Sequence, residues 1–82
     1  GHGVKKDYFK AFEWYSKAAE QGNPRAQNYL GYCNDTGEGV KQDYAKSFEW
    51  FSKAAEQGDA DGQYNLGYCF YNGKGVKQDY VK

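Results

Sequence analysis

Two thiols are the residues of this chain best suited to chemistry. Cys33 and Cys69 are its only cysteines and stand 36 positions apart in 82 residues. No Lys, Arg or His lies at helical spacing from either one to lower the thiol pKa. Equivalent positions in stacked helical repeats lie roughly 10 Å apart, whereas a disulfide needs Cα atoms within about 7 Å. We therefore expect two small buried hydrophobes without an internal disulfide.

A metal or cofactor site lacks a ligand set. His2 is the only histidine, and no Cys-x-x-Cys pair occurs. Structural zinc sites take four Cys or His ligands. Gly1 and His2 also resemble a remnant of tag removal and are left out of the fold prediction. We expect neither a metal nor a cofactor.

A β-lactamase-like hydrolase is the catalytic alternative, and the serines do not fit it. Its nucleophile stands in a Ser-x-x-Lys motif, whereas Lys directly follows Ser16 and Ser52. Trp50 occupies the third place after Ser47. A Ser/His/Asp or Cys/His set is also lacking, because the one histidine lies at the terminus. We predict that the chain is not an enzyme.

The charge balance excludes two classes of partner. Eleven basic and eleven acidic side chains cancel, so the basic patch of a nucleic-acid binder or of a protein held on an anionic membrane is not expected. No apolar run approaches the roughly 20 residues that span a bilayer, and no charged segment followed by an apolar one opens the chain as a secretion signal would. We expect a soluble protein of one small domain, in an unknown compartment.

One phrase recurs along the chain. It reads GVKKDY from Gly3 and GVKQDY from Gly39 and Gly75. The same shift of 36 residues aligns DYFKAFEWYSKAAEQG with DYAKSFEWFSKAAEQG. A period of this length indicates a solenoid of helix pairs. We predict a single all-α, α/α solenoid over residues 1–82, with units starting near 3, 39 and 75 and the last one incomplete.

Capping residues predict the helix boundaries. Four polar residues stand where an N-cap side chain accepts a backbone N–H, namely Asp7, Asn23, Asp43 and Asp59. Gly22 and Gly58 suit the left-handed conformation that ends a helix. GxGV loops end the second helix of each pair. The predicted helices are 7–21, 24–35, 43–57 and 60–71.

Taken together, the motifs A-x-x-x-L-G, G-x-G-V-x-x-D-Y and K-A-x-E-W-Y-x-K-A-A-E-Q-G resemble the Sel-one-like repeat (SLR) family, a TPR-like α/α solenoid. The resemblance covers residues 3–82. It implies a scaffold or adaptor that binds other proteins, without catalysis. In two places the chain departs from the family pattern: Asn34 stands where the second copy has the aromatic Phe70, and Gly62 stands where the first copy has Ala26.

Two glycines lie inside the predicted shorter helices. Gly31 and Gly67 each cost about 1 kcal/mol relative to Ala. Since the cost is accepted in both copies, we predict a close approach of a neighbouring helix at both positions.

The shorter helices present a second, polar and aromatic face opposite their apolar stripe. The resemblance implies that this face lines the concave side of the solenoid and binds a peptide or partner helix. Tyrosine is enriched at interaction hot spots. The alternative is a structural spacer, in which the same tyrosines pack on an adjacent repeat. The predicted protein-binding residues are Arg25, Asn28, Tyr32, Asp35, Asp61, Tyr64, Tyr68 and Tyr71, with Thr36 and Asn72 beside them.

The last ten residues, GKGVKQDYVK, begin a third repeat. Val76, Tyr80 and Val81 lack the aromatic stretch that normally follows them. Because stacked repeats bury their faces on neighbours, and about three are needed for stability, the two end faces should complement each other. We predict head-to-tail association, or exchange of an end helix between two chains.

Overall fold

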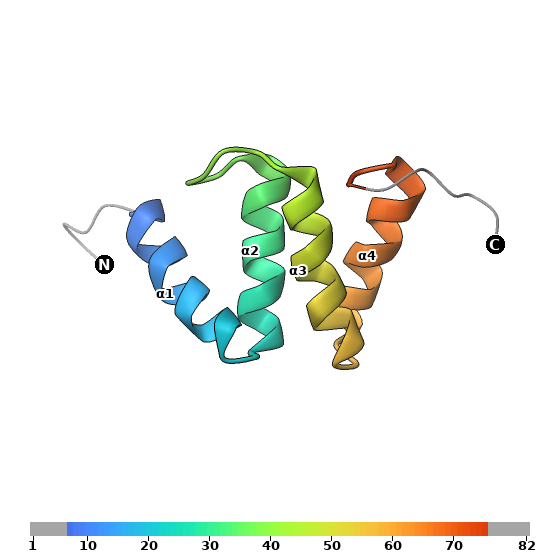
Figure 1. Ribbon diagram of the computed structural model, residues 1–82, viewed down its shortest axis with the longest axis horizontal. Coiled ribbons are helices and arrows are strands. Elements are labelled where there is room, and N and C mark those ends of the chain that lie inside the picture. The colour runs from blue at the N-terminus through green and yellow to red at the C-terminus, as the bar shows by residue number, and fades with distance from the viewer. Residues whose placement is uncertain (1–6, 76–82) are drawn as a thin grey trace.

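The computed structural model describes residues 7–75, which form four α-helices in one row (Figure 1). They are α1 (Tyr8–Glu20), α2 (Pro24–Thr36), α3 (Tyr44–Glu56) and α4 (Ala60–Asn72). The described part of the chain holds no strand, so the all-α solenoid prediction is confirmed. The predictions on Gly3, Val76, Tyr80 and Val81 lie outside the described residues.

The helices begin where the caps predict. Oδ1 of Asp7 accepts the Lys10 N–H at 3.0 Å, and Oδ1 of Asp43 accepts the Lys46 N–H at 3.1 Å. Asn23 caps α2 and Asp59 caps α4 in the same way. These bonds reach only three residues along the chain and satisfy an N–H that has no partner inside the helix. Each helix start is therefore determined locally.

The turns inside each pair use a glycine in the left-handed region. Gly22 has a φ of 96° and Gly58 a φ of 85°. A side chain at either place would be strained, because only glycine takes this conformation at low cost. Both sharp turns bring the second helix of a pair back along the first.

The core connects the two pairs. Ala19, Ala26 and Leu30 form a buried cluster, and Trp50 of α3 packs against it. Burying an indole on neighbouring apolar side chains is among the larger contributions that one residue makes to stability. Trp50 thus packs the second helix pair against the first.

Both cysteines lie in the interior. Cys33 is 0% and Cys69 1% exposed, and both are free thiols. Burial raises the pKa of both thiols, because the thiolate loses its hydration. The prediction of small buried hydrophobes is confirmed.

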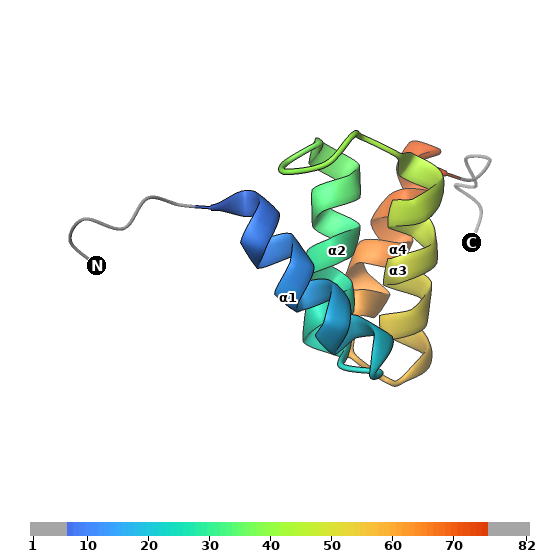
Figure 2. The same cartoon turned by 60° about the vertical axis from the view of Figure 1, so that its left-hand side comes forward.

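The two pairs differ in their internal aromatic packing. In the second pair, the rings of Phe48 and Phe70 meet edge to face, with centroids 5.5 Å apart. Asn34 takes the place of that second ring in the first pair. There Tyr15 stacks on Tyr29 instead, with centroids 4.0 Å apart. Figures 1 and 2 show α1 leaning away from α2 toward its N-terminal end.

Helical glycines mark close approaches at two of three positions. A Cβ on Gly31 would lie 2.5 Å from the ring of Phe51, so the predicted close approach is confirmed there. A Cβ on Gly62 would lie 2.7 Å from the Ala55 nitrogen, which explains a glycine where the first copy has Ala26. A Cβ on Gly67 would have no atom of a neighbouring described helix within 4 Å, so that half of the prediction is wrong among residues 7–75.

Candidate functional site

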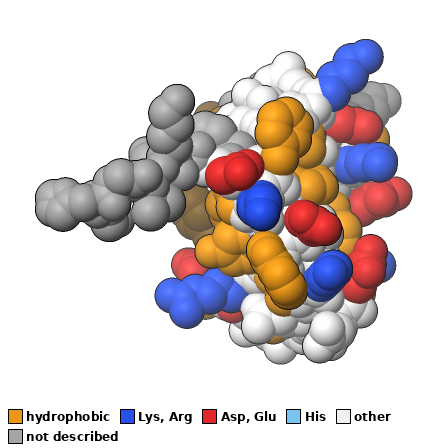
Figure 3. Space-filling view, turned by 90° about the vertical axis from the view of Figure 1, so that its left-hand side faces the viewer, with side chains coloured by type: hydrophobic (Ala, Val, Ile, Leu, Met, Phe, Trp, Pro, Cys, Tyr) orange, Lys and Arg blue, Asp and Glu red, His pale blue; other side chains and the backbone are white. Residues whose placement is uncertain are grey.

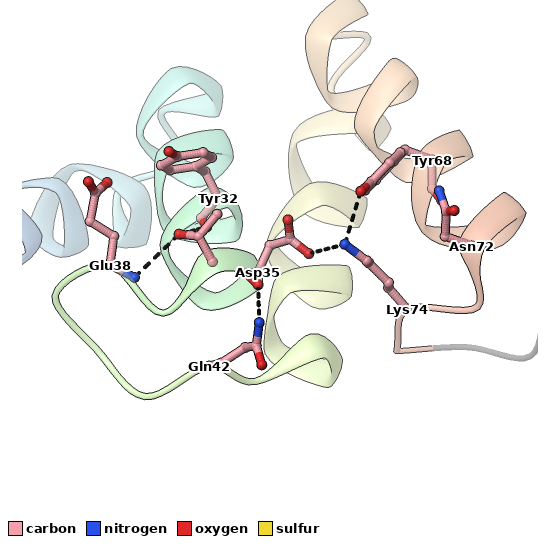
Figure 4. Close-up of polar contacts among 8 residues, drawn as sticks. Tyr32, Asp35, Glu38, Gln42, Tyr68, Asn72 and Lys74 are labelled. Atoms are coloured by element: carbon pink, nitrogen blue, oxygen red, sulfur yellow. Dashed lines mark hydrogen bonds and ion pairs between the residues drawn. The ribbon is translucent and has the colours of Figure 1, made fainter.

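Two predicted binding residues of α2 contact the second pair. The side-chain amide of Asn28 donates to Oδ2 of Asp59 at 2.6 Å. The carboxylate of Asp35 forms an ion pair with Lys74, 3.2 Å away (Figure 4). Both residues are half-buried. The sequence placed them on an open face, and the structure corrects this: the next repeat covers that part of α2.

Lys74 was absent from the predicted site, although it links two of its members. Its Nζ donates to the hydroxyl of Tyr68 at 2.9 Å, and the ammonium lies 4.8 Å from the centre of that ring (Figure 4). The bond to Tyr68 is the largest cause that raises the pKa of Lys74, ahead of the Asp35 carboxylate. Lys74 therefore stays charged and connects α2 to α4. The equivalent residue of the first copy is Glu38, so the repeat gave no signal for it.

The three tyrosines of α4 gather around one glycine. A shallow groove of about 380 Å³ is lined by Gln63, Tyr64, Gly67, Tyr68 and Tyr71. Tyr64 is 76% and Tyr71 62% exposed. We call this set of five residues the tyrosine groove.

The remaining predicted residues lie outside the groove. Tyr32 of α2 is 49% exposed and occupies the position equivalent to Tyr68. Arg25 and Asp61 are also exposed, at equivalent positions with opposite charge. A single exposed charge contributes under about 1 kcal/mol to an ion pair, so neither residue by itself would hold a partner.

The structure contains a second hollow that the sequence analysis did not predict. It has a volume of about 570 Å³ and lies between α1, α2, α3 and the loop that joins α2 to α3. Its signal in the sequence was Asn34, the small residue at an aromatic position. We call it the Asn34 cavity; its walls are Phe12, Ser16, Glu20, Leu30, Asn34, Val40, Lys41, Gln42, Asp43, Lys46 and Trp50.

The α1 end of the molecule is also rich in exposed aromatic rings. Figure 3 looks onto this end and shows hydrophobic side chains lying among charged ones. Phe9 is 79%, Trp14 65% and Tyr15 40% exposed. Trp50, the counterpart of Trp14, is half-buried, because it has a preceding pair to pack on.

The described residues lack a cluster of metal ligands, and the hydroxyl of their most buried serine has no hydrogen-bond partner among them. Residues 7–75 contain no group of three or more His, Cys, Asp or Glu side chains that could hold a metal ion. Ser47, the most buried of the serines, is 0% exposed and its hydroxyl has no hydrogen-bond partner among these residues.

None of the four described helices is long and apolar enough to span a membrane.

Comparison with known sequences decides the family. The sequence model of the Sel1 repeat matches residues 1–23, 24–59 and 60–82. The chain belongs to the Sel1 repeat family. Sel1 repeats are generally protein–protein interaction modules, and proteins built from them are typically scaffolds without enzymatic activity. No curated protein sequence matches the chain.

Three solved structures show similar Sel1 repeats. A protective antigen of uropathogenic Escherichia coli with an SLR fold, c5321, is 51% identical with a TM-score of 0.88, over 95% of this chain and 17% of that one. A Sel1 repeat protein from Oxalobacter formigenes is 50% identical with a TM-score of 0.87, over 95% and 32%. Cysteine-rich protein B of Helicobacter pylori is 36% identical with a TM-score of 0.84, over 90% and 56%. The chain thus spans little more than half of even the third of these proteins.

Proposed function

We propose that this Sel1 repeat chain is an interaction module that receives an amphipathic helix in the tyrosine groove of α4. One observation supports the proposal. The ring of Phe51 lies over Gly31 of α2, whereas the equivalent Gly67 of α4 has no described atom within 4 Å of the place that a Cβ would occupy. Among residues 7–75, the same kind of surface is thus covered in one repeat and open in the other.

A helix suits this groove better than an extended peptide does. On α2 the equivalent surface is covered by α3, an amphipathic helix that places an aromatic ring where the glycine leaves room. Ridges of one helix pack into the grooves of another at axial distances of about 8–10 Å, which a missing Cβ makes easier to reach. An incoming helix with an aromatic residue over Gly67 would reproduce that packing.

The tyrosines supply binding energy at a low entropic cost. Each has a large apolar face and a hydroxyl, and few rotatable bonds that must be fixed. The bond from Lys74 to the Tyr68 hydroxyl already orients one ring. Preorganisation of this kind improves affinity because less order must be created on binding.

Such a helix can come from two sources with nearly the same sequence: the first helix of another repeat, or α1 of a second copy of the chain. Residues 7–22 and 43–58 are nearly the same sequence, and α1 carries exposed Trp14 and Tyr15. Association of α1 on α4 is head-to-tail, so it extends rather than closes. If the tyrosines serve only to pack on an adjacent repeat, the module is a spacer.

The test is a titration of a fluorescent peptide of residues 43–58 with the protein, followed by anisotropy. We expect saturable binding, weakened at least tenfold by Gly67→Leu or Tyr64→Ser. A peptide with Phe51→Ala is the matched control ligand and should bind more weakly. Tyr32→Ser is the matched control variant and should bind like the parent chain.

The binding experiment and a separate measurement of self-association can each contradict the proposal. Equal affinity of the parent, Gly67→Leu and Tyr64→Ser chains would contradict the tyrosine groove as the binding surface. Light scattering tests self-association separately: a strictly monomeric species at millimolar concentration would contradict the head-to-tail form.

A further inference from the structure

We propose that the Asn34 cavity is a pocket for the aromatic side chain of a bound polypeptide. It lies away from the tyrosine groove and rests on none of the same residues. The inference therefore goes beyond the proposed function and can fail independently of it.

The second repeat shows what this place accommodates. There the ring of Phe70 meets Phe48 edge to face, with an interplanar angle of 88°. The equivalent residues of the first repeat are Asn34 and Phe12, and both line the cavity. The first repeat keeps one ring of the pair and lacks the other. A ring from outside would restore an aromatic contact worth about 0.5–1.5 kcal/mol beyond the apolar area it buries.

The walls suit an aromatic ring. Phe12, Leu30 and Trp50 supply apolar surface from three helices. A volume of about 570 Å³ also exceeds what one ring needs, and it falls in the range of pockets that hold drug-sized ligands, about 300–1,000 Å³. The cavity can therefore take a ring together with the backbone on either side of it.

Polar groups in the walls suit a peptide backbone. Asn34 is 5% exposed, and its Oδ1 accepts no hydrogen bond from any residue between 7 and 75. A buried acceptor without a partner costs about 1–3 kcal/mol, which the N–H of a peptide group bound beside it can offset. Ser16 and Gln42 in the walls offer further donors and acceptors.

The charge of the walls is balanced, so the cavity has no net charge that would favour a strongly charged ligand. Glu20 and Asp43 carry negative charge, and Lys41 and Lys46 positive charge. A charged ligand of either sign would meet two wall side chains of opposite charge and two of its own charge, with no net attraction. A neutral aromatic side chain on a peptide needs no such attraction and suits the apolar surface of Phe12, Leu30 and Trp50.

The test uses N-acetyl-phenylalanine methylamide as the probe and N-acetyl-alanine methylamide as its control, in an NMR titration of the whole chain. We expect saturable shifts of the Trp50 indole and Asn34 amide signals with the phenylalanine probe and none with the alanine probe. Asn34→Phe should raise the melting temperature and weaken probe binding at least tenfold, because its own ring fills the pocket.

A second pair of variants tests the pocket even if the Asn34→Phe chain does not fold. Ser16→Tyr narrows the cavity from α1, and Ser52→Tyr makes the same change at the equivalent position of α3, which does not line it. We expect the first variant to weaken the probe at least tenfold and the second to leave binding unchanged. Equal shifts with both probes, or undiminished binding by Ser16→Tyr, would overturn the proposal.

Discussion

Oδ2 of Asp59 accepts two hydrogen bonds, one from the side-chain amide of Asn28 at 2.6 Å and one from the backbone N–H of Gly62 at 2.8 Å. The N-cap of α4 is thereby also a link to α2, across 31 residues of sequence. The equivalent cap, Asn23, bonds Ala26 of its own helix at 3.0 Å. One kind of capping residue thus acts locally in the first repeat and between repeats in the second.

This double role predicts that Asp59→Ala costs more stability than Asn23→Ala. Loss of an N-cap costs about 0.5–2 kcal/mol. Asp59→Ala also leaves the half-buried amide of Asn28 without its acceptor, which adds about 1–3 kcal/mol. Urea unfolding followed by circular dichroism measures both variants. Equal losses would show that the link to Asn28 contributes nothing.

Alanine at the two helical glycines should have opposite effects. Alanine in place of glycine favours a helix by about 1 kcal/mol. Gly67→Ala should give that gain, since no described atom lies within 4 Å of the new Cβ. Gly31→Ala should destabilise, because the buried ring of Phe51 must move and overpacking costs about 1–3 kcal/mol. Thermal unfolding of the two variants checks the sign of each change.

The free energy of unfolding of the chain should be lower at alkaline pH than at neutral pH. Burial, the largest cause, raises the pKa of Tyr29 to about 12, and it raises the pKa of Cys33 and Cys69 as well. These groups ionise first in the unfolded chain, at a pKa of about 8.5 for a thiol and about 10 for a tyrosine. Their contribution to the free energy of unfolding is fully present below those values and is lost as pH rises toward the folded pKa values.

The measurement is the urea midpoint between pH 7 and pH 11, which should fall progressively above about pH 8.5. Cys69→Ala removes one ionising thiol, so its midpoint should fall less steeply with pH, whatever its value at pH 7. An identical slope for the variant would contradict a role for this thiol.

The two tryptophans should report different environments. Trp50 packs against the cluster of Ala19, Ala26 and Leu30, whereas Trp14 is 65% exposed. A Trp14→Phe chain, which keeps Trp50, should emit at shorter wavelength and be quenched less by acrylamide than a Trp50→Phe chain. The same emission from both chains would mean that Trp50 does not hold the pairs together as described.

Local chemistry made the helices predictable. Each helix begins at an N-cap side chain that accepts a hydrogen bond from the backbone N–H three residues later; the caps are Asp7, Asn23, Asp43 and Asp59. A glycine in the left-handed conformation follows the first helix of each pair, where the chain turns back. The predicted bounds differ from the observed ones by one residue or so, because a cap and its partner lie within one turn. The repeat of 36 residues likewise placed both cysteines on the buried stripe.

The state of each face was decided by tertiary structure alone. Gly31 and Gly67 are the same residue at the same repeat position, yet one lies under Phe51 and the other is open among residues 7–75. Asn28 and Asp35 looked exposed on their helix, and partners 31 and 39 positions away in the sequence cover them. A helical pattern defines the faces of one helix, whereas burial depends on which other helix lies beside that face. For the same reason the Asn34 cavity, which needs α1, α2 and α3 together, became visible only when they were placed in space.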